Sequence, residues 1–395
     1  MDYNNYLNPT LVSVKPSGIR KFFSIAEEMD DVISLGVGEP DFKTPWHIRQ
    51  TGINSLEQGA TRYTANAGLI LLRNEIANYY KRRFNVNYSA DGEIMVTVGG
   101  SEGIDMAIRS LVCPGDEVLV VEPSFVCYKP IIEICGGVAV PIVTENKNNF
   151  KLMPEEIENA VTDKTKLIVL PFPNNPTGAV MRRSDLEKIA EVIKKHDLFV
   201  LSDEIYCELT YGNEKHTTIA SIDGMQERTI VINGFSKTYS MTGWRLGYAL
   251  GPAPVIKQMT KLHQFAIMSA PTTAQYAAIE GLRHGDGDIE YMRNEYNIRR
   301  RLIVDGFTRM GLTCFEPEGA FYIFPSIKST GLTSEEFCTK LIKSRRVAVI
   351  PGTAFGDCGE GYIRVSYSYS LGHIMEALNR IEMFINDPDA PAMDS

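Results

Sequence analysis

Lys237 and Arg245 are two cations in one polar segment that directly follows an apolar run. The segment reads GFSK (234–237) and then MTGWRLG (241–247). A lysine at the end of an apolar strand can lose its water, which lowers the pKa of its amine and makes it a nucleophile. Arg245 offers a planar cation suited to bidentate phosphate contact. A single lysine in a loop is more often an ordinary surface residue. A functional role for Lys237 therefore depends on the other polar segments of the chain.

Three more polar segments follow apolar runs in the same way: GGS (99–101), PNNPTG (173–178) and SDEIY (202–206). In open α/β sheets, ligands bind beyond the carboxyl ends of the strands, where such loops converge. A Gly-Gly pair before a helix also lets backbone N–H groups approach an anion. GxxxxGK[ST] is absent and GxGxxG does not follow a first strand, which disfavours a P-loop and a dinucleotide fold. The segments together predict one site at one sheet edge.

The elements that must position these segments alternate along the chain, and we expect an α/β fold with a mostly parallel sheet. Most of the strands read as continuously apolar, as expected when both sheet faces are covered. Helices are expected over Leu69–Arg83, from about Ser101, and over Ser184–His196, where Ser184 and Glu187 fit a capping box. The expected strands are Glu93–Val98, Glu117–Val121, Ala139–Val143, Lys166–Leu170, Leu198–Ser202, Thr229–Asn233 and Gly247–Leu250.

The pattern changes after about residue 285, where a long charged helix (285–311) precedes shorter strands. The strands are expected over Phe321–Phe324, Val347–Ile350 and Tyr362–Tyr367. We predict a large domain over 46–285, and a smaller α+β domain formed by 286–395 together with the N-terminal residues 1–45.

Composition excludes several classes of function. A formal charge of -9 over 395 residues argues against nucleic-acid binding. The longest apolar runs are shorter than the roughly 18 to 20 residues that span a bilayer, and the N-terminus does not read as a signal peptide. The seven cysteines form no CxxC pair and the histidines form no HExxH motif, so we expect no metal and a cytoplasmic protein with free thiols.

The segment GFSKTYSMTGWRLG (234–247) is similar to the lysine-attachment signature of class I/II pyridoxal-phosphate aminotransferases of the aspartate aminotransferase superfamily. The other polar segments match the same family in the same order, from about residue 10 to residue 385. The resemblance implies the type I pyridoxal-phosphate fold, in which the large domain binds the cofactor and the small domain closes over the substrate. It also implies a homodimer with its sites at the subunit interface.

The resemblance implies a role for each matched residue. Lys237 would form the Schiff base with pyridoxal 5'-phosphate and move the proton at the substrate α-carbon. Asp203 would pair with the pyridine nitrogen and keep the ring an electron sink. Tyr206 and Asn175 would bond the phenolic oxygen, and Phe125 would stack on the ring.

Further matches concern the phosphate and the substrate. Gly38 and Arg364 match positions that bind the substrate α-carboxylate, beside Phe125 and Asn175. Tyr63 matches a tyrosine that reaches the phosphate from the partner subunit. The expected phosphate ligands within the chain are Gly100, Ser101, Ser236 and Arg245. Many relatives have a serine as a phosphate ligand where this chain has Gly234, so the expected phosphate contacts differ from theirs at this position while the expected cofactor stays the same.

The expected reaction is transfer of an amino group from an L-amino acid to a 2-oxo acid such as 2-oxoglutarate. A carbon–sulfur β-lyase of the same fold is an alternative, and a cofactor-responsive transcription regulator is another, disfavoured by the negative charge. The donor stays open between aspartate, aromatic amino acids and a broad range. Some aspartate-preferring relatives carry a lysine where this chain has Ser101, which favours a permissive pocket, although Lys15, Arg20 or Lys21 could supply a cation.

Overall fold

The computed structural model describes residues 1–16, 18–19, 29, 31–212 and 214–392. Its centre is a seven-stranded sheet of order β2-β8-β7-β6-β5-β3-β4, in which β8 runs antiparallel to β2 and β7 and the remaining neighbours pair in parallel. The strands are β2 (Ile94–Thr97), β3 (Glu117–Glu122), β4 (Val138–Val143), β5 (Thr165–Leu170), β6 (Phe199–Asp203), β7 (Thr229–Gly234) and β8 (Gly247–Leu250). Each of the seven predicted strands is present, and the mostly parallel α/β sheet is confirmed.

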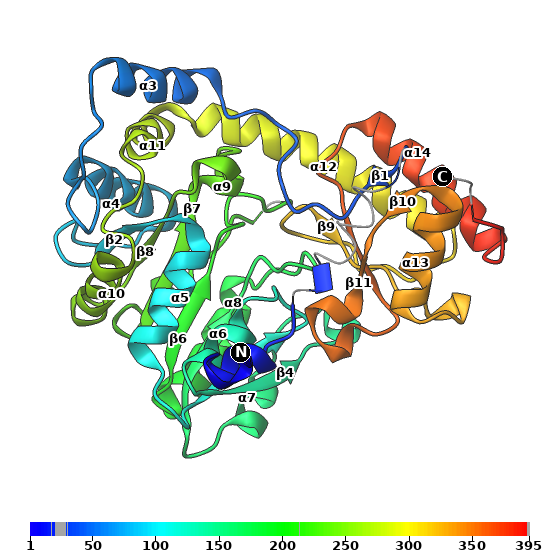
Figure 1. Ribbon diagram of the computed structural model, residues 1–395, viewed down its shortest axis with the longest axis horizontal. Helices are drawn as coiled ribbons and strands as arrows, with labels where there is room; N and C mark the ends of the chain where they lie inside the picture. The colour runs from blue at the N-terminus through cyan, green and yellow to red at the C-terminus, as the bar shows by residue number, and fades with distance from the viewer. Residues whose placement is uncertain (17, 20–28, 30, 213, 393–395) are drawn as a thin grey trace.

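Helices cover the sheet because its central strands are apolar on both faces (Figure 1). Strands β5 to β8 are almost completely buried, and three clusters of buried side chains surround them. The helices of this part are α1 (Pro9–Ser13), α3 (Trp46–Glu57), α4 (Ile70–Phe84), α5 (Gly99–Leu111), α6 (Tyr128–Ile134), α7 (Pro154–Ala160), α8 (Arg183–Lys195), α9 (Phe235–Thr238), α10 (Ala253–Ala266) and α11 (Thr272–His284).

The first turn of α8 differs from the prediction. Ser184 lies inside the helix and is not its cap, so the predicted Ser184–Glu187 capping box is wrong. The helix begins one residue earlier, with Arg182 as the N-cap, and the Asp185 carboxylate accepts a hydrogen bond from the Arg182 backbone N–H at 3.0 Å. Asp185 stands three residues after the N-cap Arg182, and this spacing lets its carboxylate reach back to the N–H of the cap.

The long helix α12 (Asp286–Arg309) runs from the central sheet to the C-terminal part of the molecule, where α13 (Ser334–Arg345) and α14 (Leu371–Asn386) pack (Figure 1). That part contains a three-stranded antiparallel sheet of β11 (Ile350–Pro351), β12 (Ile363–Ser366) and β9 (Tyr322–Ile323). The expected strand over Val347–Ile350 is wrong as a single strand: its start, β10 (Val347–Ala348), pairs in parallel with β1 (Ile33–Ser34), and its end belongs to β11.

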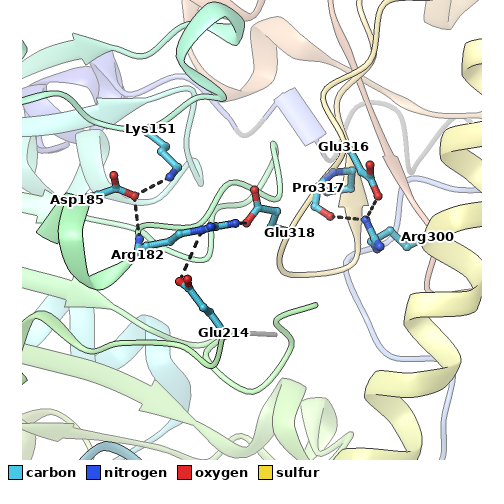
Figure 2. Close-up of polar contacts among 8 residues, drawn as sticks. All are labelled: Lys151, Arg182, Asp185, Glu214, Arg300, Glu316, Pro317 and Glu318. Carbon is cyan, nitrogen blue, oxygen red and sulfur yellow. Dashed lines mark hydrogen bonds and ion pairs between the residues drawn. The ribbon is translucent and has the colours of Figure 1, made fainter. Parts of the chain in front are cut away.

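Ion pairs connect the segment before β9 to the large sheet's loops. Figure 2 shows the Arg182 guanidinium between Glu318 at 2.9 Å and Glu214 at 3.7 Å. On the other side of the segment, Arg300 of α12 pairs with Glu316 at 2.6 Å (Figure 2). The residues that lead into β9 are therefore held from two elements that are distant in sequence.

Candidate active site

The loops that follow β2, β3, β5, β6 and β7 open into one cavity of about 580 Å³ at the carboxyl edge of the sheet. This volume lies within the range of small-molecule sites. The predicted site residues that line it are Gly38, Gly100, Ser101, Phe125, Asn175, Asp203, Tyr206, Ser236, Lys237, Arg245 and Arg364. The fold thus brings together eleven of the predicted site residues, from positions 38 to 364.

Lys237 lies on the one-turn helix α9, directly after β7. Its amine donates a hydrogen bond to the Gly38 carbonyl at 2.5 Å. Burial lowers its pKa to about 8, with Glu39 opposing the shift and the two arginines Arg364 and Arg245 adding to it. At a given pH below 10 a larger fraction of this amine is neutral, and so able to act as a nucleophile and proton acceptor, than of an ordinary lysine.

Arg245 faces the first turn of α5 and gives one end of the cavity a positive charge. Its own backbone is left-handed, with φ 52°, and one guanidinium nitrogen donates to the Thr242 carbonyl at 2.9 Å. A Cβ at Gly99 would lie 2.5 Å from the guanidinium, and Gly99 has φ +78°, so only glycine suits this position. The N-terminus of α5, Ser101, Ser236 and Arg245 together give this end of the cavity donors suited to an anion.

Gly234, where many relatives have serine, is explained by the packing of β7 on β8. A Cβ at this position would lie 3.0 Å from the Gly247 Cα and 3.1 Å from the Leu246 carbonyl oxygen. A side chain there would need β8 to shift by a few tenths of an ångström, so glycine suits this close approach of the two strands. The serine hydroxyls that line the cavity come from Ser101 and Ser236 instead.

Asp203 ends β6 and is 8% exposed. The Tyr128 hydroxyl donates to one carboxylate oxygen at 2.6 Å, and the Ile205 backbone N–H donates to the other at 3.2 Å. Burial raises the pKa of Asp203, although both hydrogen bonds oppose the shift. A buried carboxylate of this kind gains most from a cationic partner in the cavity.

Tyr206 and Arg364 both line the cavity and both contact Tyr322. The Tyr206 hydroxyl lies 2.8 Å from the hydroxyl of Tyr322. Arg364 is 2% exposed, donates to Asn175 Oδ1 at 3.0 Å and to the Gly36 carbonyl, and has an unpartnered Nε within the described residues. Its guanidinium forms no ion pair with a carboxylate in the described part of the chain. It is therefore available to donate hydrogen bonds to the carboxylate of a ligand.

Tyr63 is the predicted site residue that does not line this cavity. Its side chain is 83% exposed, on the surface of the single chain. Among the cations considered for a dicarboxylic substrate, Lys15 is exposed and does not line the cavity, whereas Arg20 and Lys21 lie outside the described residues.

The structure adds cavity residues that sequence reasoning missed, notably Tyr128, Tyr322 and Glu39. Tyr128 follows Phe125 by three residues, so the start of α6 was the available signal. Tyr322 had no such signal, because only the return of the chain through α12 brings β9 to the cavity.

A family model described as aminotransferase class I and II matches residues 30–381. The chain belongs to this family. It is 45% identical over 376 residues to the aspartate aminotransferase of Pyrococcus abyssi, covering 95% of this chain and 97% of the relative. It is 43% identical over 383 residues to aromatic-amino-acid aminotransferase 2 of Thermococcus litoralis, with 96% and 98% covered.

The fold of this aminotransferase also matches that of a solved structure. The structure of an aromatic aminotransferase from Pyrococcus horikoshii OT3 superposes with a TM-score of 0.89 at 42% identity, covering 94% of this chain and 99% of the other. The prediction of an aminotransferase is confirmed. The carbon–sulfur β-lyase alternative gains no support, because these relatives are named for amino transfer. No helix within the described residues is long and apolar enough to cross a membrane.

Proposed function

We propose that this aminotransferase works with pyridoxal 5'-phosphate held in the cavity, with Lys237 as its attachment and proton-transfer residue. The observation that carries the proposal is the presence of three chemistries in one cavity: an anion-binding end, a buried carboxylate, and a buried amine. The cofactor has a phosphate, a basic ring nitrogen and an aldehyde, so each of these groups has a matching partner.

The donor set fits the cofactor residue by residue. Gly100, Ser101, Ser236 and Arg245 would hold the phosphate at the start of α5. Asp203, already oriented by Tyr128, would pair with the ring nitrogen. Phe125 would stack on the ring, and Tyr206 and Asn175 would bond its phenolic oxygen.

When bound, pyridoxal phosphate supplies an aldehyde that links to amines and a ring that accepts the electron pair released at the substrate α-carbon. Lys237 Nζ, with its pKa lowered to about 8 mainly by burial, can take the proton from that carbon and return it. Asp203 keeps the ring nitrogen protonated, because a buried carboxylate without a cation is costly. Arg364 orients the substrate through its α-carboxylate, with Gly38 and Asn175 beside it.

We propose a permissive amino donor range, with neutral and aromatic amino acids accepted at rates comparable with aspartate and with 2-oxoglutarate as acceptor. The cavity-lining cations within the described residues are Lys237, Arg245 and Arg364, and each has a task already. A second substrate carboxylate would be buried without a partner, which is costly. The names of the relatives, which include both aspartate and aromatic aminotransferases, are consistent with either donor.

A panel of amino donors with 2-oxoglutarate, ranked by kcat/KM, tests this range. We expect aromatic and neutral donors within tenfold of aspartate, and Ser101→Lys should raise the preference for aspartate. Preference for aspartate by a hundredfold or more in the unaltered enzyme, roughly 2.7 kcal/mol, would require a cation that the described residues do not provide.

We further propose a homodimer in the cytoplasm, with Tyr63 of one subunit reaching the phosphate of the other. Residues 286–395, together with the part of the N-terminal arm (1–45) that pairs with them through β1, would form the small domain that closes over the substrate and excludes water. The exposure of Tyr63 in the single chain supports its use at an interface. Light scattering of the purified enzyme should give twice the mass of the chain, and a monomer that is fully active would contradict the proposal.

A further inference from the structure

Tyr322 contacts both Tyr206, to which the proposed function gives the cofactor oxygen, and Arg364, to which it gives the substrate carboxylate. It lies on β9, is 1% exposed, and its hydroxyl is 2.8 Å from the hydroxyl of Tyr206. Its ring lies under the guanidinium of Arg364, with the Cζ atom 4.5 Å from the ring centroid. One side chain therefore contacts both the tyrosine of the cofactor oxygen and the arginine of the substrate carboxylate.

The Tyr322 hydroxyl is also fixed against the loop that carries Gly38. A Cβ at position 38 would lie 2.4 Å from this hydroxyl, so any side chain there would displace it. The same Gly38 carbonyl accepts the hydrogen bond of Lys237. Tyr322 thus lies within a continuous set of contacts that ends at the reacting amine.

Backbone hydrogen bonds of the segment before Tyr322 fix the position of this residue. The Gly319 N–H donates to the Gly178 carbonyl at 2.8 Å, and the Ala320 N–H donates to the Leu209 carbonyl at 2.8 Å. The Arg182–Glu318 ion pair anchors the start of the same segment (Figure 2). The position of Tyr322 is therefore set by the loops after β5 and β6, which carry Asn175 and Tyr206.

We propose that Tyr322 is a positioning residue, whose hydroxyl orients Tyr206 toward the cofactor oxygen and whose ring supports Arg364 for the substrate carboxylate. This inference rests on the proposed function of Tyr206 and Arg364. If the Tyr206 hydroxyl donates its hydrogen bond to the cofactor, it can only accept the hydrogen bond that joins it to Tyr322. The Tyr322 hydroxyl must then be the donor. A hydrogen bond received by Tyr206 strengthens the one it gives.

The hydroxyl and the ring can be separated by substitution. Tyr322→Phe removes only the hydroxyl, and Tyr322→Leu also removes the ring beneath Arg364. Tyr367→Phe is the matched control: Tyr367 is fully buried near the same segment, and its hydroxyl donates to the Ala320 carbonyl at 3.1 Å, outside the cavity. Tyr206→Phe and the double variant with Tyr322→Phe complete a cycle.

Two readouts other than turnover report the two roles. The first is the pH midpoint of the absorbance change of the cofactor-bound enzyme, which rises when a donor to the phenolic oxygen is lost. The second is the Kd of 3-phenylpropionate, a carboxylate that cannot react, measured by calorimetry. We expect Tyr322→Phe to raise the midpoint in the same direction as Tyr206→Phe, with a double variant no higher than Tyr206→Phe and a Kd within twofold of the unaltered enzyme.

Tyr322→Leu should in addition weaken 3-phenylpropionate binding about tenfold, roughly 1.4 kcal/mol, while Tyr367→Phe should move neither readout. The inference is overturned if Tyr322→Phe leaves the midpoint unchanged, if its effect adds fully to that of Tyr206→Phe, if Tyr322→Leu keeps the Kd, or if Tyr367→Phe shifts both readouts equally. An unchanged midpoint in Tyr206→Phe itself would instead defeat the proposed role of Tyr206, and this inference with it.

Discussion

The buried amine of Lys237 should destabilise the cofactor-free protein at neutral pH. The pKa of Lys237 is lowered from its ordinary 10.5 to about 8, chiefly by burial. Because the unfolded chain binds the proton more tightly than the folded one, this cost is fully present below about pH 8 and disappears as the pH rises to 10.5. Lys237→Met removes the amine while keeping a side chain of similar length.

The size of the effect follows from the two pKa values. The cost is about 3 kcal/mol at pH 7 and falls below about 1 kcal/mol at pH 10. These are upper bounds, because the side chain keeps some contact with solvent, which screens the charge. The variant also loses the hydrogen bond to the Gly38 carbonyl, an offset of about 1 kcal/mol that depends little on pH.

The assay is urea unfolding of both cofactor-free proteins at pH 7 and pH 10, at the same protomer concentration. The free energy of unfolding of Lys237→Met, relative to the unaltered protein, should be higher at pH 7 than at pH 10 by about 1 to 2.5 kcal/mol. Lys257→Met, which replaces an exposed lysine of α10, should show no such difference. A pH-independent difference for Lys237→Met would show that its amine is not desolvated, and the reasoning on its reactivity would fail.

Two further predictions concern residues around the cofactor. Asp203→Asn should spare folding but slow single-turnover deprotonation of the substrate by more than tenfold, about 1.4 kcal/mol, since a ring nitrogen without a carboxylate loses its proton; rapid-mixing absorbance measures this rate, and a smaller loss would remove Asp203 from the assigned role. Tyr63→Phe and Lys237→Ala, each impaired alone, should regain partial activity when combined as heterodimers, because one site then carries neither change. Verified heterodimers without recovery would place Tyr63 in its own subunit's site or outside any site.

The sequence predicted the sheet well because its strands are continuous apolar runs of four to six residues, with polar loops at one edge. Strands of two residues such as β10 and β11 could not be separated, because adjacent residues of one apolar run pair with different partners. The N-terminal cap of α8 was missed for a related reason. Ser184 and Glu187 have the spacing of a capping box, but so do Arg182 and Asp185, and the structure forms the second pair.

The site was predictable where a motif fixes both residue and spacing, as for Lys237, Asp203 and Asn175. It was not predictable where tertiary packing alone makes the contact. Tyr322 reaches the cavity only because the segment before β9 bonds to Gly178 and Leu209, and no local pattern around it announces this. The close approach of β7 and β8 likewise explains Gly234 only once the pairing is known.

The most direct test of the account exposes the purified, cofactor-loaded enzyme to an L-amino acid with no 2-oxo acid present, and measures the products over time. Amino transfer predicts one equivalent of 2-oxo acid per protomer and then no further reaction, because the amino group stays on the enzyme, and it predicts none at all from Lys237→Ala. Continued release of ammonia and 2-oxo acid would show a lyase, and an undiminished reaction in Lys237→Ala would show that another residue does the chemistry.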